Sequence, residues 1–220
     1  MFDGVIKRAR DQGIPVIAVN TDDPKGSEGN ARLSYIGQEY YDAGFMVAKT
    51  AVNEYFPNPS PEKLDILITI GAPGAGWAEQ RKSGMMDYLT EEYGVPEGNI
   101  DTLDSTVDAA KIQSRVQGYL QAHPNTNMVL STQFSVGGYL GAQAIGMEPG
   151  ELTVAGFDLV PTVVEGVKKG YIDFTVDQQP YLQGYLPVVQ LYHMLENNIR
   201  AFNVNTGMAV VDKSKIDMYD

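Results

Sequence analysis

Several short apolar runs of this chain, each typical of a buried strand, end in polar residues. The runs 152–157 and 171–176 are followed by Asp158 and, two residues on, by Gln178. Ligands of open α/β sheets bind outside the carboxyl ends of the strands. A carboxylate accepts two hydroxyl hydrogen bonds, and an amide both donates and accepts them. Asp158 and Gln178 are therefore predicted to recognise a small polar ligand.

Two further amides stand at the ends of such runs. Gln133 follows the run 128–130, and Asn20 closes the run 15–19. We expect Gln133 to donate and accept hydrogen bonds at the same edge of a sheet. Asp22 and Asp177 occupy similar places and are lesser candidates.

Trp77 and Arg81 lie one helical turn apart, after the apolar run 64–70 and a glycine-rich turn. A guanidinium is a planar fork of donors that suits adjacent hydroxyls, and an aromatic face packs on apolar C–H groups. Other roles remain open for these residues. Arg81 could be a solvated surface residue, Trp77 could belong to the core or a hinge, and Asp158 could cap the following helix.

The glycine-rich turn 71–76 also invites a dinucleotide-binding interpretation, because it follows a strand and opens a helix. Its second and third glycines have the wrong spacing, however, and Pro73 replaces a potential N–H donor. Asp104 lies too far along the chain for the ribose-binding acid. We therefore expect no cofactor here, and a turn that admits a neutral ligand instead.

The composition excludes several classes of function. The net charge is −12, which argues against nucleic acid and against an anionic membrane surface. There is no cysteine, and the two histidines, His123 and His193, are far apart, so we expect neither a metal site nor thiol catalysis. No nucleophile elbow, membrane span or signal peptide is recognisable, so we expect no direct membrane insertion.

Strand and helix patterns alternate almost without exception, which is typical of parallel sheets covered by helices on both faces. The helices are expected at 1–12, with Val5 and Ile6 facing inward, and at 40–55, 77–92, 136–145, 160–169 and 180–200. Ser105–Asp108 is expected to form a capping box for a helix that runs to 123. A proline-rich surface connection is expected at 57–61. The chain opens on a helix with no preceding strand, so we expect an N-terminal part to be absent.

The order of these pieces resembles the periplasmic sugar-binding proteins of bacterial ABC importers, in their ribose-type branch. The resemblance spans the whole chain and rests on six main segments. They are GIPVIAVNTD (13–22), LSYIGQEYYDAG (33–44), WAEQRKSG (77–84), LQAHPN (120–125), VAGFD (154–158) and VDQQPYLQG (176–184). The final segment NTGMAVVDKSKID (205–217) also looks like that branch.

The resemblance implies the type I periplasmic binding protein fold, an α/β architecture of two Rossmann-like lobes with parallel sheets. The chain would cross a hinge near 37–38, 178–179 and 207–208. The N-terminal lobe, 1–37 plus 180–206, would be incomplete, and the C-terminal lobe would hold 39–178 plus 208–220. The residues predicted to bind the ligand are Asn20, Trp77, Arg81, Gln133, Asp158 and Gln178. The resemblance supports Asn20, Arg81 and Asp158, which match ligand positions of the family, whereas Val107 stands where the ribose-type pattern has a stacking aromatic.

The function implied is that of a non-enzymatic solute-binding protein, which binds a monosaccharide or polyol and presents it to a membrane permease. Its location would be periplasmic or otherwise extracytoplasmic. Exposed edges of the incomplete lobe are expected to favour self-association. Two alternatives remain open, the effector-binding domain of a LacI-type repressor and a Rossmann-type enzyme.

Overall fold

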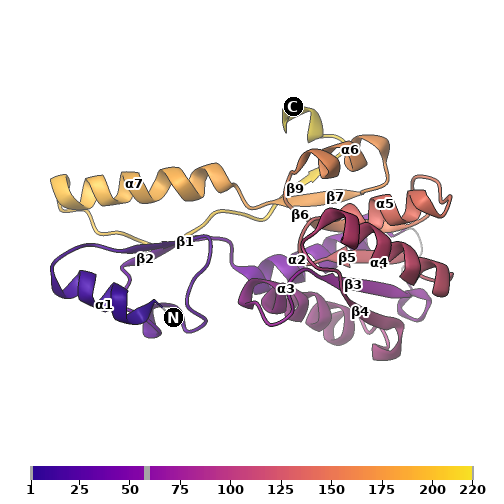
Figure 1. Ribbon diagram of the computed structural model, residues 1–220, viewed down its shortest axis with the longest axis horizontal. Coiled ribbons are helices and arrows are strands. Elements are labelled where there is room, and N and C mark those ends of the chain that lie inside the picture. The colour runs from indigo at the N-terminus through magenta and orange to yellow at the C-terminus, as the bar shows by residue number, and fades with distance from the viewer. Residues whose placement is uncertain (1, 57–59, 220) are drawn as a thin grey trace. The chain divides into compact units, whose positions relative to one another are not determined.

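The computed structural model describes residues 2–56 and 60–219 (Figure 1). Most of the proline-rich connection expected at 57–61 therefore lies outside the described residues. The chain forms two compact units: unit 1 contains Met1–Glu39 and Gln178–Gly207, and unit 2 contains Tyr40–Asp177 and Met208–Asp220. The chain thus passes between the units three times. Gln178 belongs to unit 1, whereas the sequence analysis placed it at the end of the other lobe.

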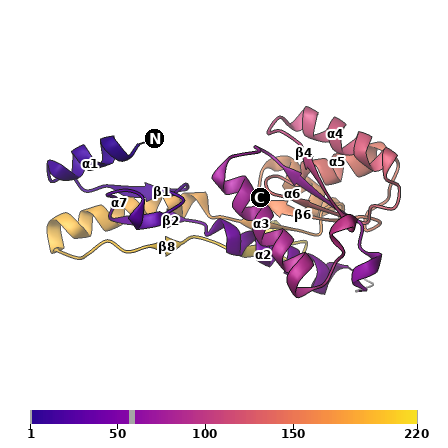
Figure 2. The same cartoon turned by 90° about the horizontal axis from the view of Figure 1, so that it is seen from below.

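Unit 1 is a three-stranded parallel sheet in the order β1-β2-β8, with a helix on each side (Figure 1). Its elements are β1 (Ile17–Val19), β2 (Ser34–Gly37), β8 (Val204–Asn205), α1 (Asp3–Asp11), α7 (Pro180–Asn197) and a 3₁₀ turn at Gly26–Glu28. Helix α7 packs on β1 and β2, as Figure 2 shows from below. The inward-facing role expected for Val5 is wrong, because this side chain is 55% exposed.

Unit 2 is built on a six-stranded sheet in the order β4-β3-β5-β6-β7-β9. All neighbours are parallel except β9, which runs antiparallel to β7. The strands are β3 (Ile66–Ile70), β4 (Ile100–Asp104), β5 (Met128–Ser131), β6 (Thr153–Phe157), β7 (Phe174–Asp177) and β9 (Ala209–Asp212). The helices are α2 (Tyr40–Thr50), α3 (Gly76–Asp87), α4 (Ala109–Ala122), α5 (Val136–Ala144) and α6 (Pro161–Lys169). Short 3₁₀ turns lie at Pro61–Lys63, Glu97–Asn99 and Ile216–Tyr219.

Two hydrophobic cores lie on opposite faces of this sheet. In β3, Ile66 and Ile68 join the core formed with α2 and α3, while Leu67 joins the core formed with α4, α5 and α6. Successive side chains of a strand point to opposite faces, so a strand covered on both sides reads as a continuous apolar run. The predicted α/β fold with helices on both faces is thereby confirmed.

The two long helices that pack beside β3 each end in a turn of a different helix type. The helices extend to residues 55 and 92, as predicted, and the last turn of each is π-helix, at Ala51–Tyr55 and Tyr88–Glu92. Among the described residues, no helix has the length and apolar character needed to cross a membrane.

Candidate functional site

The carboxyl ends of β3, β5 and β6 meet at one edge of the unit 2 sheet. The register pairs Thr69 of β3 with Ser131 of β5, and Leu130 of β5 with Ala155 of β6. The segments that leave these strands therefore start side by side. They carry four of the six predicted residues, namely Trp77, Arg81, Gln133 and Asp158.

Arg81, on α3, is held within a group of aromatic rings. Its guanidinium carbon lies 3.7 Å from the ring centre of Phe157, 5.1 Å from that of Tyr40 and 5.8 Å from that of Trp77. Its Nη1 donates a hydrogen bond of 2.9 Å to the carbonyl oxygen of Thr132. Only 3% of the residue is exposed, so the interpretation of Arg81 as a solvated surface residue is wrong. Attraction between a guanidinium and ring faces fixes the plane of the donor fork.

Two glycines bring α2 close enough to α3 to form this group. A Cβ at Gly44 would lie 2.0 Å from the carbonyl oxygen of Arg81, and one at Gly84 would lie 2.1 Å from that of Tyr41. Such distances are far below van der Waals contact, so neither position has room for a side chain. The close helix pair sets Tyr40 against Arg81. Tyr40 and Phe157 are not among the site residues predicted from the sequence.

Asp158 directly follows β6 and has a left-handed backbone, with φ of 68°. Its N–H donates to the carbonyl oxygen of Val176 (2.9 Å), and its own carbonyl accepts from Thr175 Oγ1 (2.8 Å). The alternative that Asp158 caps the following helix is wrong, because the N-cap of α6 is Val160. The half-buried carboxyl-bearing residue is thus anchored by its backbone at the end of the strand.

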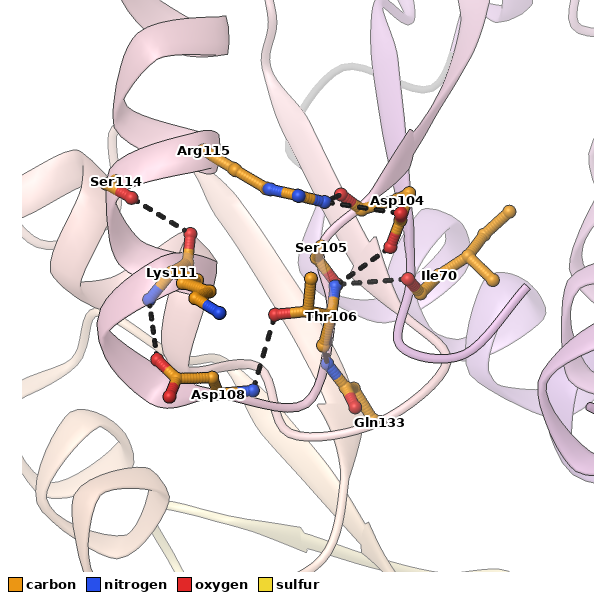
Figure 3. A network of polar contacts seen from close by, with 9 residues as sticks. All are labelled: Ile70, Asp104, Ser105, Thr106, Asp108, Lys111, Ser114, Arg115 and Gln133. Carbon is orange, nitrogen blue, oxygen red and sulfur yellow. Dashed lines mark hydrogen bonds and ion pairs between the residues drawn. The ribbon is translucent and has the colours of Figure 1, made fainter.

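Gln133, which follows β5, is buried and bonded inside the protein. Its Nε2 donates to the carbonyl oxygen of Thr106 and to Ser105 Oγ (3.3 Å), and its Oε1 lies so close to Gly71 that a Cβ there would clash at 2.0 Å. Figure 3 shows Gln133 beside the turn that contains Thr106. The structure therefore gives Gln133 a supporting role at this edge, while a direct contact with a ligand stays a prediction.

The predicted capping box at Ser105–Asp108 is wrong. The N-cap of α4 is Asp108, whose Oδ1 accepts a 3.0 Å hydrogen bond from the backbone N–H of Lys111 (Figure 3). Ser105 is buried instead, and its hydroxyl lies 3.3 Å from the carbonyl oxygen of Ile70. Serine and aspartate are both favoured N-cap residues, so residue type alone does not decide between Ser105 and Asp108. The spacing of Ser105 and Asp108 matches a capping box, which explains the incorrect prediction.

Unit 1 brings the other two predicted residues together. Asn20 follows β1, with φ of 62°, and its Nδ2 lies 3.4 Å from Oε1 of Gln178. The same nitrogen donates a 2.9 Å hydrogen bond to Oε1 of Gln183, on α7. Asp22, the lesser candidate beside them, forms a two-pronged ion pair with the buried Arg32 and so has a structural partner.

Left-handed backbone recurs after strands of both sheets. Besides Asn20 and Asp158, Thr106 has φ of 62° and Gln179 has φ of 55°, each two residues after a strand. This conformation is uncommon in residues other than glycine. Among those residues Asn and Asp adopt it most often, whereas for a β-branched residue it is an outlier. Strained backbone gathers at functional sites. Thr106 could not be predicted from the sequence, because threonine is not a residue type that indicates a left-handed backbone.

The groups that each unit provides are suited to a neutral, hydroxyl-rich ligand. Unit 2 supplies a fixed guanidinium, a carboxylate and aromatic faces, and unit 1 supplies paired amides. Amides both donate and accept hydrogen bonds, a guanidinium donates them, a carboxylate accepts them, and aromatic faces cover apolar C–H surface. The structure places Asn20 next to Gln178, and Trp77 next to Arg81.

Comparison with known proteins identifies the family. A family model described as a periplasmic binding protein domain matches residues 1–199. The chain is 30% identical, over 99% of its length, to the xylose/arabinose-binding protein XylF of Sulfolobus acidocaldarius, and it spans 55% of the length of that relative.

Solved structures show the same architecture. A periplasmic sugar-binding protein from Legionella pneumophila is similar over 94% of this chain and 74% of its own, with a TM-score of 0.78 and 29% identity. A solute-binding protein from Burkholderia graminis, solved in complex with D-arabinose, is similar over 96% and 71%, with a TM-score of 0.77 and 28% identity. The match of the family model to most of the sequence shows that this chain belongs to the periplasmic binding protein domain family.

Proposed function

We propose that this protein is the sugar-binding component of an ABC importer, with a monosaccharide or related polyol as its ligand. The observation that carries the proposal is the guanidinium of Arg81, buried and fixed on the ring of Phe157 beside the strand ends. A fixed fork of donors recognises adjacent sugar oxygens with little loss of conformational entropy on binding. The relatives named above are sugar-binding proteins, which supports the same conclusion.

Each predicted residue has a role in this proposal. Arg81 donates to sugar oxygens, Asp158 accepts from two hydroxyls, and Trp77 covers an apolar C–H face of the ring. Asn20 and Gln178 contribute amides from unit 1. Gln133 contributes a further amide from its buried position after β5.

The role is binding and not catalysis. The relatives are named as binding proteins of transporters, and the candidate residues are donors, acceptors and rings, without a nucleophile paired to a base. We further propose that the protein acts outside the cytoplasm and delivers its ligand to a membrane permease, as the periplasmic names of its relatives suggest.

Self-association through α7 is also proposed, with a second copy of this chain as the partner. The outer face of α7 exposes apolar side chains at a regular helical spacing, and the helix carries a single charged residue, Glu196. The exposed residues are Tyr181, Tyr185, Val188, Tyr192 and Leu195. Two such faces can pair about a twofold axis without charge repulsion. Light scattering at tens of micromolar protein should then give a dimer, and a monomer throughout that range would refute this association.

Titration with pentoses, hexoses and polyols, followed by the fluorescence of the only tryptophan and by calorimetry, tests the binding function. We expect saturable binding of one class of sugar and a stabilisation of about 2.7 kcal/mol at roughly a hundred times Kd. Arg81→Lys keeps the charge but loses the fork, so affinity should fall about tenfold or more. The control is Arg115→Lys, since Arg115 is an exposed residue of α4 paired with Asp104. A folded protein that binds none of the sugars at millimolar concentration would refute the proposal.

A further inference from the structure

The three places where the chain leaves or enters unit 1 are bonded to one another. Nε2 of Gln38 donates to the carbonyl oxygen of Gly207 (2.7 Å), which joins the first crossing to the third. Thr206 Oγ1 donates to the carbonyl oxygen of Gln178 (2.8 Å), which joins the third to the second. The backbone N–H of Thr206 also donates to the carbonyl oxygen of Gly37 (3.0 Å). The crossings therefore form one hydrogen-bonded group.

Gln183, on the first turns of α7, lies at the centre of this group and is only 5% exposed. Its Nε2 donates to the carbonyl oxygen of Gln178 (2.9 Å) and to Oγ1 of Thr206 (3.0 Å). Its Oε1 accepts the 2.9 Å hydrogen bond from Nδ2 of Asn20. One buried amide thus links the end of β1 to the second and third crossings.

Tyr35 closes the group on the other side of Asn20. Its hydroxyl lies 2.7 Å from the carbonyl oxygen of Asn20 and 3.0 Å from that of Gln38. A Cβ at Gly37 would lie 2.2 Å from this hydroxyl, so only glycine leaves it room. Asn20 is therefore held through its side chain by Gln183 and through its backbone by Tyr35.

We propose that Gln183 is a positioning residue, which fixes the amide of Asn20 for the ligand and ties it to the second and third crossings. This inference rests on the proposed sugar-binding function. A hydrogen bond to Nδ2 determines how the Asn20 amide is turned, and hence which groups it presents. Loss of the Gln183 amide would remove its hydrogen bonds to Asn20, Gln178 and Thr206 at once.

A second buried glutamine of the same helix is a matched control. Gln190 is 8% exposed, and its amide bonds the backbone of Phe202 (3.0 and 3.2 Å) and Oγ of Ser34 (3.3 Å). It lies seven residues after Gln183, so both face the sheet from α7. Its bonds reach neither Asn20 nor the crossings, and a structural loss at Gln190 should not change the binding site.

The test compares Gln183→Leu with Gln190→Leu in sugar titrations of the full chain. We expect Kd to rise about tenfold or more in Gln183→Leu and less than about twofold in Gln190→Leu, although both variants lose a buried amide. Equal changes in the two variants, or an unchanged Kd in Gln183→Leu, would overturn the inference. If Gln183→Leu fails to fold, Thr206→Val serves instead, because it removes the hydroxyl that bridges Gln183 and Gln178.

Hydrogen exchange without ligand separates this inference from the proposed function. The backbone N–H groups of Asn20 and Thr206, bonded to Ile36 and Gly37, should exchange faster in Gln183→Leu but not in Gln190→Leu. If the unaltered protein binds no sugar, the proposed function fails while the exchange result still decides the role of Gln183. Exchange that rises only around α7, and not at Asn20 and Thr206, would refute that role.

Discussion

Asp173 should make unit 2 less stable as the pH rises through the weakly acidic range. The residue precedes β7, at the edge of the sheet opposite the candidate site, and Oδ2 accepts a 2.8 Å hydrogen bond from the backbone N–H of Val154. Burial raises the pKa of its carboxyl from 3.8 to about 6, against the opposing effect of that hydrogen bond. The folded state therefore retains a proton that the unfolded chain has released.

The sign and the size follow from this difference. Stability contributed by the protonated carboxyl is complete below pH 3.8 and is lost as the pH rises through about 6. A shift of about two pKa units corresponds to at most about 3 kcal/mol. Because Asp173 retains some access to water, we expect a loss of about 1–2 kcal/mol across this window.

Asp173→Asn should remove this dependence, since an amide oxygen can still accept from the N–H of Val154. We expect the variant to melt about 3–6 °C above the unaltered protein at pH 7.5 and at nearly the same temperature near pH 4. Melting curves at several pH values measure the difference. Asp217→Asn is the control, because Asp217 is highly exposed. A gain of equal size at both pH values, or none at pH 7.5, would refute this reasoning.

Three further substitutions test how the candidate site is built. Gly44→Ala should push α3 away through its clash with the carbonyl oxygen of Arg81, costing about 1–3 kcal/mol and weakening sugar binding, as melting and titration would show. Thr106→Asn should raise the melting temperature, because Asn tolerates the left-handed backbone better than a β-branched residue; a loss of stability would contradict the strain argument. Asp108→Ala should cost about 1 kcal/mol in urea unfolding, because it removes the cap on Lys111; an unchanged midpoint would speak against Asp108 as the N-cap.

The architecture was predictable because the helices and central strands of unit 2 carry strong local patterns. The run 66–70 is apolar except for Thr69, and the structure buries all of it between two layers of helices. The strand β8, by contrast, is only two residues long and is defined by its pairing with β2. A pattern of period two cannot be recognised over two residues, so this strand required the structure.

In helix α7, the polarity of a side chain does not indicate whether it is buried. In this helix Tyr185 and Tyr192 are exposed, while Gln183 and Gln190 are buried. The buried amides are tolerated because backbone carbonyls and side chains of unit 1 satisfy them. Two of the partners of Gln183, Asn20 and Thr206, lie far from it along the chain, so no local pattern could have revealed its burial.

The candidate site shows the same division between side-chain chemistry and backbone geometry. Asn20 and Asp158 were predicted from their residue types at strand ends, and Asn and Asp are the non-glycine residues that most readily adopt the left-handed backbone found there. Thr106 and Gln179 adopt it without that advantage, at a cost of order 1 kcal/mol or more each. Such strain persists only where surrounding contacts fix the conformation, as the bond from Gln133 to the carbonyl oxygen of Thr106 does. A buried glutamine therefore holds a residue that follows a strand in each unit. In unit 2, Gln133 bonds Thr106, whose residue type disfavours the left-handed backbone. In unit 1, Gln183 bonds the side chain of Asn20, whose residue type does not determine how the amide is turned.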